Sequence, residues 1–75
     1  MKAIKLREAP DKLFALAMEV EKRAEAKGLP LNHPNRRRPV SRFLNGAVLC
    51  EQHLASNDID RAKGLLAGFG FTVKE

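Results

Sequence analysis

The chain has 75 residues, of which 44% are hydrophobic and one is a cysteine, and its formal net charge is +5. This length allows at most one domain, and a single cysteine excludes an internal disulfide. Because the chain has neither a run of 18 apolar residues nor a stretch typical of a signal peptide, we expect a soluble cytoplasmic protein without membrane contact. Domains this small usually need a disulfide, a metal or a partner subunit, so the composition favours an oligomer.

The positive charge is concentrated in two short segments. Residues 1–7 hold three basic residues and no acid, and residues 36–42 hold four arginines and no acid. The rest of the chain holds seven basic and nine acidic residues, so it is slightly negative. Two basic segments on a mildly acidic body are typical of a surface that binds a polyanion.

Residues 2–7 are predicted to form a short strand, because charged and apolar side chains alternate along them. The inward face of this strand would carry Ile4 and Leu6. The outward face would carry three other residues: Ala3, Lys5 and Arg7. Glu8-Ala9-Pro10 should end the strand, since proline is confined to strand edges and ends.

Two long helices are predicted to follow. The first begins near Pro10, has apolar residues at helical spacing and stops at Gly28. Residues 29–39 contain three prolines and no periodicity, so they are predicted to be a long connection. The second helix is expected from about Pro39 or Val40 to about Ala55.

The remaining residues, 56–75, are predicted to hold a short third helix and an extended tail. The helix would run from Ile59 to about Ala67 and be capped by Asn57 or Asp58. We expect this part to pack on the preceding helices.

Few single residues suggest chemistry. His33 and His53 have no further ligand at metal-binding spacing, so they are expected to be ordinary polar residues of a loop and a helix surface. Cys50 falls on an apolar stripe and is expected to be a core residue. Gly46 lies inside the second helix, and a close helix–helix crossing would explain it. The sequence has no nucleophile–base arrangement and no phosphate-binding glycine loop, so we expect no enzyme, no catalytic residue, no metal and no cofactor.

The order of strand, helix, turn and helix resembles the ribbon-helix-helix family, which includes the Arc, Mnt and methionine repressors and the CopG-like plasmid regulators. Ile4-Lys5-Leu6-Arg7 is similar to the family's strand, and Arg23-Ala24-Glu25-Ala26-Lys27-Gly28 to its first helix end and turn. Ser41-Arg42-Phe43-Leu44-Asn45-Gly46-Ala47-Val48 is similar to the start of its second helix. The resemblance covers about residues 2–55, with a first helix about one turn longer than in the shortest members and a longer turn after Gly28.

The resemblance implies a mainly α fold with one short N-terminal strand, in which two chains intertwine as a ribbon-helix-helix homodimer. Residues 1–55 would form the DNA-binding and dimerisation domain, with residues 56–75 as an added helix and tail packing on it. The dimer core would contain six apolar residues: Ile4, Leu6, Leu13, Phe43, Leu44 and Ala47.

The resemblance also implies a function. The strands of two subunits would form an antiparallel ribbon that enters the major groove of double-stranded DNA and contacts bases through Ala3, Lys5 and Arg7. The start of the second helix would hold phosphates through five residues: Arg36, Arg37, Arg38, Ser41 and Arg42. The expected activity is sequence-specific repression of transcription by a nucleoid-associated homodimer, with higher-order assembly on tandem sites.

Other functions fit the same residues. An antitoxin with a toxin partner, or a plasmid DNA-processing accessory protein, would share the fold. An alternative of another class is a small basic inhibitor of phage type that binds an acidic protein. In that case the two outer strands, KAIKLR and FGFTVK, would pair within one chain.

Overall fold

The structure, a computed structural model, describes residues 2–74. Met1 begins the predicted domain of residues 1–55 and Glu75 ends the predicted part of residues 56–75, and both lie outside the described residues. The side chain of Lys2 is not described either.

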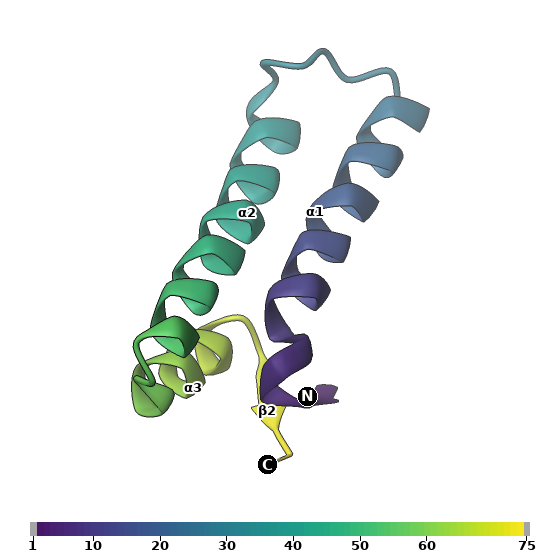
Figure 1. The fold of residues 1–75 in the computed structure, drawn as a ribbon. Helices are drawn as coiled ribbons and strands as arrows, with labels where there is room; N and C mark the ends of the chain where they lie inside the picture. The colour runs from purple at the N-terminus through teal and green to yellow at the C-terminus, as the bar shows by residue number, and fades with distance from the viewer. Residues whose placement is uncertain (1, 75) are drawn as a thin grey trace.

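Two long antiparallel helices form the body of the molecule. Helix α1 (Ala9–Ala26) runs beside α2 (Pro34–Ala55), and α3 (Ile59–Gly68) packs against one end of this hairpin (Figure 1). Strands β1 (Lys2–Ile4) and β2 (Phe71–Val73) form a parallel pair at the same end. The described chain is therefore mainly helical, with three α-helices and one short strand pair.

The predicted strand over residues 2–7 is too long. It ends at Ile4, and Leu6–Glu8 form a single turn of 3-10 helix, η1, that leads directly into α1. This turn is closed by the backbone N–H of Glu8, which donates to the carbonyl of Lys5 at 3.0 Å. The two predicted faces are nevertheless correct, because Ile4 and Leu6 are buried while the three residues between and beside them are exposed.

The first helix begins and ends close to its predicted bounds. Gly28 follows it with a φ of +74°, a conformation that glycine adopts without strain. The N–H of Gly28 donates to the carbonyl of Glu25, and the N–H of Leu29 donates to that of Ala24, both at 3.0 Å. These two bonds satisfy carbonyls at the helix end in the Schellman arrangement and turn the chain toward α2.

The second helix begins at Pro34, five or six residues earlier than predicted, so the predicted connection over residues 29–39 is too long and only residues 29–33 belong to it. Pro34 occupies the first helical position, where its missing N–H costs nothing, and the Nδ1 atom of His33 accepts the N–H of Asn35 at 3.1 Å. Pro39 lies inside the helix, where a proline removes one internal hydrogen bond and typically costs about 3 kcal/mol. Contacts made by Arg36 with α1, described below, hold this first part of α2 in place.

The hydrophobic core lies at the end of the hairpin where α3 and the strands meet. Its largest fully buried side chains are Leu13, Cys50 and Leu66, one from each helix. Ile4 from β1 and Phe71 from β2 are buried in the same cluster. The tail that was predicted to be extended is therefore a strand that supplies core residues.

Gly46 faces the aromatic ring of Phe69, which follows α3, and the side chain of Leu13 in α1. A Cβ atom added at this position would lie 2.6 and 2.7 Å from two carbons of the Phe69 ring. The Phe69 ring also packs on Phe43, with 5.6 Å between the ring centroids. The glycine thus makes room for the residue that ends α3.

We predict that Gly46→Ala lowers the free energy of unfolding by about 1–3 kcal/mol, because the new methyl group overpacks the site. Gly64→Ala is the matched control. Gly64 also lies inside a helix, but nothing lies within 4 Å of an added Cβ, so this change should stabilise by up to about 1 kcal/mol. Urea unfolding of both variants measures the two signs. Adding Phe69→Leu to Gly46→Ala should reduce the penalty, and equal penalties in both backgrounds would contradict the ring contact.

Candidate nucleic-acid interface

The side of α2 that points away from α1 is exposed and mixes basic, polar and apolar residues. Arg36, Ala47 and Cys50 are buried, which places their side of α2 against the rest of the protein. At 100° per residue, the exposed outer side includes the polar residues Arg37, Arg38, Ser41 and Asn45 and the apolar residues Val48 and Leu49. Residues 34–50 contain no aspartate or glutamate, so α2 itself supplies no negative charge to this surface.

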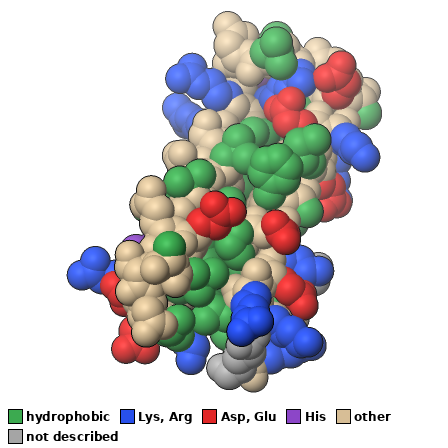
Figure 2. Space-filling model, in the orientation of Figure 1, with side chains coloured by type: hydrophobic (Ala, Val, Ile, Leu, Met, Phe, Trp, Pro, Cys, Tyr) green, Lys and Arg blue, Asp and Glu red, His purple; other side chains and the backbone are tan. Residues whose placement is uncertain are grey.

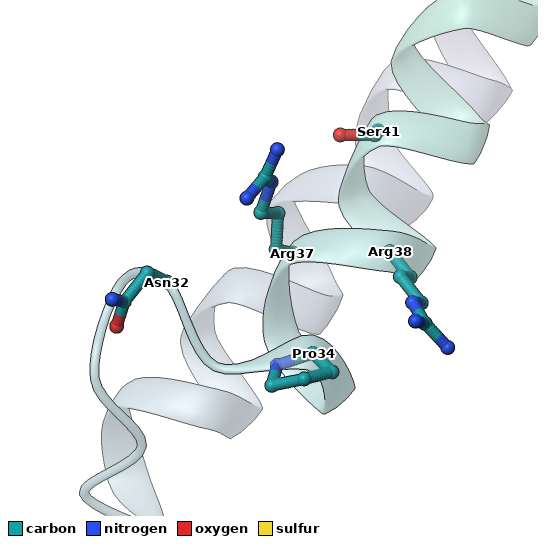
Figure 3. A pocket seen from close by; sticks show the side chains of 5 residues that line it. All are labelled: Asn32, Pro34, Arg37, Arg38 and Ser41. Carbon is teal, nitrogen blue, oxygen red and sulfur yellow. The ribbon is translucent and has the colours of Figure 1, made fainter.

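A shallow hollow of about 460 Å³ lies at the start of this surface. It is lined by Asn32 from the turn, and by Pro34, Arg37, Arg38 and Ser41 from the helix. Figure 3 shows the two arginines leaving neighbouring positions of α2 in different directions, with Ser41 one turn further along. An anion in the hollow would meet guanidinium and hydroxyl donors, which suit a phosphate group.

The backbone N–H groups at the start of α2 are already used. Pro34 has none, Asn35 donates to the His33 side chain, and Arg36 and Arg37 both donate to the His33 carbonyl. None of these backbone N–H groups is free to meet an anion, so anion binding here depends on side chains. His33, which we expected to be an ordinary polar residue, caps α2 through its ring nitrogen.

The side chain of Arg36 points toward α1, whereas those of Arg37 and Arg38 are exposed. Its side chain is buried against α1, where it donates to both carboxylate oxygens of Glu21 at 3.1 and 2.9 Å and to Glu25 at 3.0 Å. It also donates to the Leu29 carbonyl at 2.7 Å. A phosphate could reach this guanidinium only by displacing these four hydrogen bonds, so its geometry is that of a structural residue.

The pair changes the titration of both partners. The hydrogen bond from Arg36 lowers the pKa of Glu21, and the same bond raises the pKa of Arg36. Both groups therefore remain charged at neutral pH.

Arg42 lies on the exposed side of α2 but is held by α3. Its guanidinium donates to the Gly68 carbonyl at 3.1 Å and lies 4.8 Å from the centroid of the Phe69 ring. The carbonyl belongs to the C-terminal end of α3, where the helix dipole favours a positive charge. Arg42 thus ties two helices together while it adds charge to the outer surface.

The two predicted basic segments do not meet in one chain. Ala3, Lys5 and Arg7 are exposed at the end of the hairpin that holds the strands, whereas Arg37 and Arg38 lie at the end near the α1–α2 turn (Figure 1). The length of α1 separates them, and an 18-residue helix spans about 27 Å. A single polyanion-binding face built from both segments requires either a long ligand or a second chain.

The six residues predicted for a dimer core divide into two groups. Four are buried within one chain: Ile4, Leu6, Leu13 and Ala47. Phe43 is partly buried against the same cluster, and Leu44 is exposed. The monomer therefore fills its own core with most of the apolar residues that the dimer was expected to need.

Cys50 is buried in the core, as its place on the apolar stripe predicted. Burial, with a smaller contribution from the charge of Glu51, raises the pKa of its thiol. The described residues hold no cluster of three or more potential metal ligands. Within residues 2–74, every helix is too short or too polar to cross a bilayer.

No family model matches the sequence, and neither the curated proteins nor the solved structures include a significant match to the chain. The resemblance to ribbon-helix-helix proteins therefore stays a prediction. The functional argument rests on the geometry of the chain itself.

We predict that the contact between Arg36 and Glu21 makes stability depend on acid pH. The folded pKa of Glu21 lies below its unfolded value, which is near 4.3 for glutamate. The stabilisation is therefore complete above that value and is lost as the pH falls through the lower folded pKa. Glu21→Gln should lower the free energy of unfolding at pH 7, and its difference from the wild type should shrink in acid.

Glu19→Gln is the matched control for this measurement. Glu19 pairs with Arg23 at the surface of the same helix, so its loss should change stability little at either pH. Urea unfolding at pH 7 and pH 3 compares the two variants. A Glu21→Gln effect of equal size at both pH values would contradict the assigned pair.

Proposed function

We propose that the protein binds double-stranded DNA as a sequence-specific homodimeric repressor, and that the outer face of α2 is its main contact surface. The observation that carries this proposal is the 17-residue stretch 34–50, which lacks any acid and exposes the guanidinium groups of Arg37 and Arg38, the hydroxyl of Ser41 and the amide of Asn45. An α-helix fits the major groove of B-DNA. Arginine and asparagine are the side chains that make bidentate contacts with guanine and adenine.

The exposed residues on this face have complementary roles in the proposal. Arg37, Arg38 and Ser41 line the hollow near the start of α2 and contact phosphates. Asn45 lies one turn beyond Ser41 on the same side, where its amide can contact a base edge. Arg42 supplies charge while its guanidinium orients α3 against α2.

The resemblance to ribbon-helix-helix proteins offers a second way for the same function to work. In that arrangement β1 of two chains pair, and Ala3, Lys5 and Arg7 enter the major groove. Within the described residues β1 has β2 on one side only, so a partner strand would add to its other edge. The antitoxin and plasmid accessory roles use the same DNA contact and differ in what else is bound.

We predict that Arg37→Ala with Arg38→Ala weakens DNA binding. The fall of log K with log salt should also become less steep, by about 2 in slope, since each lost phosphate contact contributes about 0.9. Lys5→Ala with Arg7→Ala should leave this slope nearly unchanged if α2 is the contact surface. Relaxed sequence preference in the strand variant would instead favour the ribbon. Binding to a selected DNA site, followed by fluorescence anisotropy at several salt concentrations, measures both.

Arg61→Ala with Lys63→Ala removes the same charge from the exposed side of α3 and is the matched control. Equal DNA binding by all three double variants would overturn the proposal. Arg36 is not a useful probe, because its removal leaves Glu21 and Glu25 without their partner and disturbs the fold.

A second candidate function, a small basic inhibitor that binds an acidic protein, is supported by one observation. Strands β1 and β2 pair within one chain, which is the pairing expected for that class. A chain that is monomeric and has no affinity for DNA would favour this alternative over the repressor.

A further inference from the structure

The face of the hairpin opposite α3 carries exposed apolar side chains. Phe14 and Met18 of α1 are 53% and 49% exposed, and Leu44 and Val48 of α2 are 36% and 54% exposed. We call these four residues the apolar strip. Phe14, Leu44 and Val48 also line a hollow of about 410 Å³. Figure 2 shows apolar side chains gathered between α1 and α2 on the face turned to the viewer, with acidic side chains beside them.

The single chain also exposes more surface than its mass predicts. A folded monomer of 8.4 kDa is expected to expose about 4,600 Å², whereas this chain exposes 5317 Å². Its radius of gyration is 13.2 Å, against about 11 Å for a compact domain of 75 residues. The excess, about 700 Å², is close to the area that each partner buries in a standard protein–protein interface, about 800 Å².

The charges at the two ends of the apolar strip on α1 are complementary to each other. On α1 the order is Asp11, Phe14, Met18 and Lys22, which is acidic, apolar, apolar and basic. Helical geometry places all four within one side of α1. Two such helices packed antiparallel would bring each Asp11 to Lys22 of the partner subunit and each Phe14 to Met18 of the partner subunit. Opposite charges then meet at both ends of the contact.

We propose that a second copy of this chain covers the apolar strip, so that two hairpins pack face to face as an antiparallel four-helix bundle with a two-fold axis. Each α1 lies against the partner's α1 and each α2 against the partner's α2. Isologous contacts of this kind bury the same patch on both subunits. The interface is independent of any strand ribbon, since β1 takes no part in it.

The same packing sets the positions of the basic surfaces. The two-fold axis runs across the helices, so the sides of both α2 helices that carry Arg38 and Asn45 remain on one side of the bundle. Arg37, which helical geometry places in line with Leu44 and Val48, lies at the edge of the contact between the two α2 helices. The midpoint of the strip on α2 lies near Gly46, so Arg38 and Arg38 of the partner subunit are on the order of 25 Å apart along the bundle. One DNA duplex can contact both surfaces. This last step rests on the proposed DNA binding, whereas the dimer itself does not.

Sedimentation equilibrium of the wild type and of Phe14→Glu tests the interface. The wild type should be a dimer, and Phe14→Glu should raise the dimer dissociation constant at least about 30-fold, because the symmetric change places two charges in the contact. Leu31→Glu is the matched control, since Leu31 is 77% exposed in the α1–α2 turn, away from the strip. Circular dichroism checks that both variants keep their helices.

Charge exchange tests the antiparallel register. Asp11→Lys alone and Lys22→Asp alone should each weaken the dimer about 3- to 10-fold, and the double variant should restore it. A monomeric wild type, or a Phe14→Glu dimer as tight as the Leu31→Glu dimer, would overturn the proposal. A double variant no tighter than either single variant would overturn the register.

DNA titration of the same proteins separates this inference from the proposed function. If both hold, Phe14→Glu loses the dimer and binds DNA more weakly, while Leu31→Glu keeps both properties. A wild-type dimer that does not bind DNA overturns the proposed function and leaves the interface standing. A wild-type monomer that binds DNA overturns the interface and the homodimeric state in the proposed function, and leaves the proposed DNA binding standing.

Discussion

The contact between Arg36 and helix α1 is the constraint on which the arrangement of the hairpin depends. One buried guanidinium holds two carboxylates of α1 and the carbonyl of Leu29, and so joins both helices and the turn between them. The main hydrophobic cluster lies at the other end of the molecule, and toward this end the buried apolar side chains of α1 are the small ones of Ala17 and Ala24. A buried cation is stable only when its donors are satisfied, and here they are shared among several acceptors.

This constraint also explains the arginine run. Three consecutive arginines repel one another, and a proline follows them, which favours an extended loop in the isolated sequence. Burying Arg36 on one side of a helix forces Arg37 and Arg38 to the outer side, because successive residues are rotated by 100°. The helical form thus turns one cation inward to two acids and leaves two cations available to an external anion.

The two faces of the hairpin consequently differ in how well they are covered. One face of the hairpin is covered by α3 and the strands, with Phe69 occupying the space that Gly46 leaves free. The opposite face keeps Phe14 and Val48 in solvent. Within residues 2–74 no helix covers that face, so the apolar strip and the basic side of α2 are the two surfaces that we propose for partners.

The sequence by itself determined the order of the three helices, the approximate bounds of α1 and α3, the burial of Cys50, and the faces of Ile4, Leu6 and their neighbours. These follow from periodicity and from local signals such as Gly28, which act over a few residues. It did not determine where α2 begins, that β2 pairs with β1, or that Arg36 is structural. Those outcomes depend on groups distant in the chain, namely Glu21 and Glu25 for Arg36, Phe69 for Gly46 and Phe71 for β1. Only the tertiary structure brings such groups together. Whether a proline or a run of charges ends a helix or lies inside it depends on the distant groups that it contacts in the folded protein.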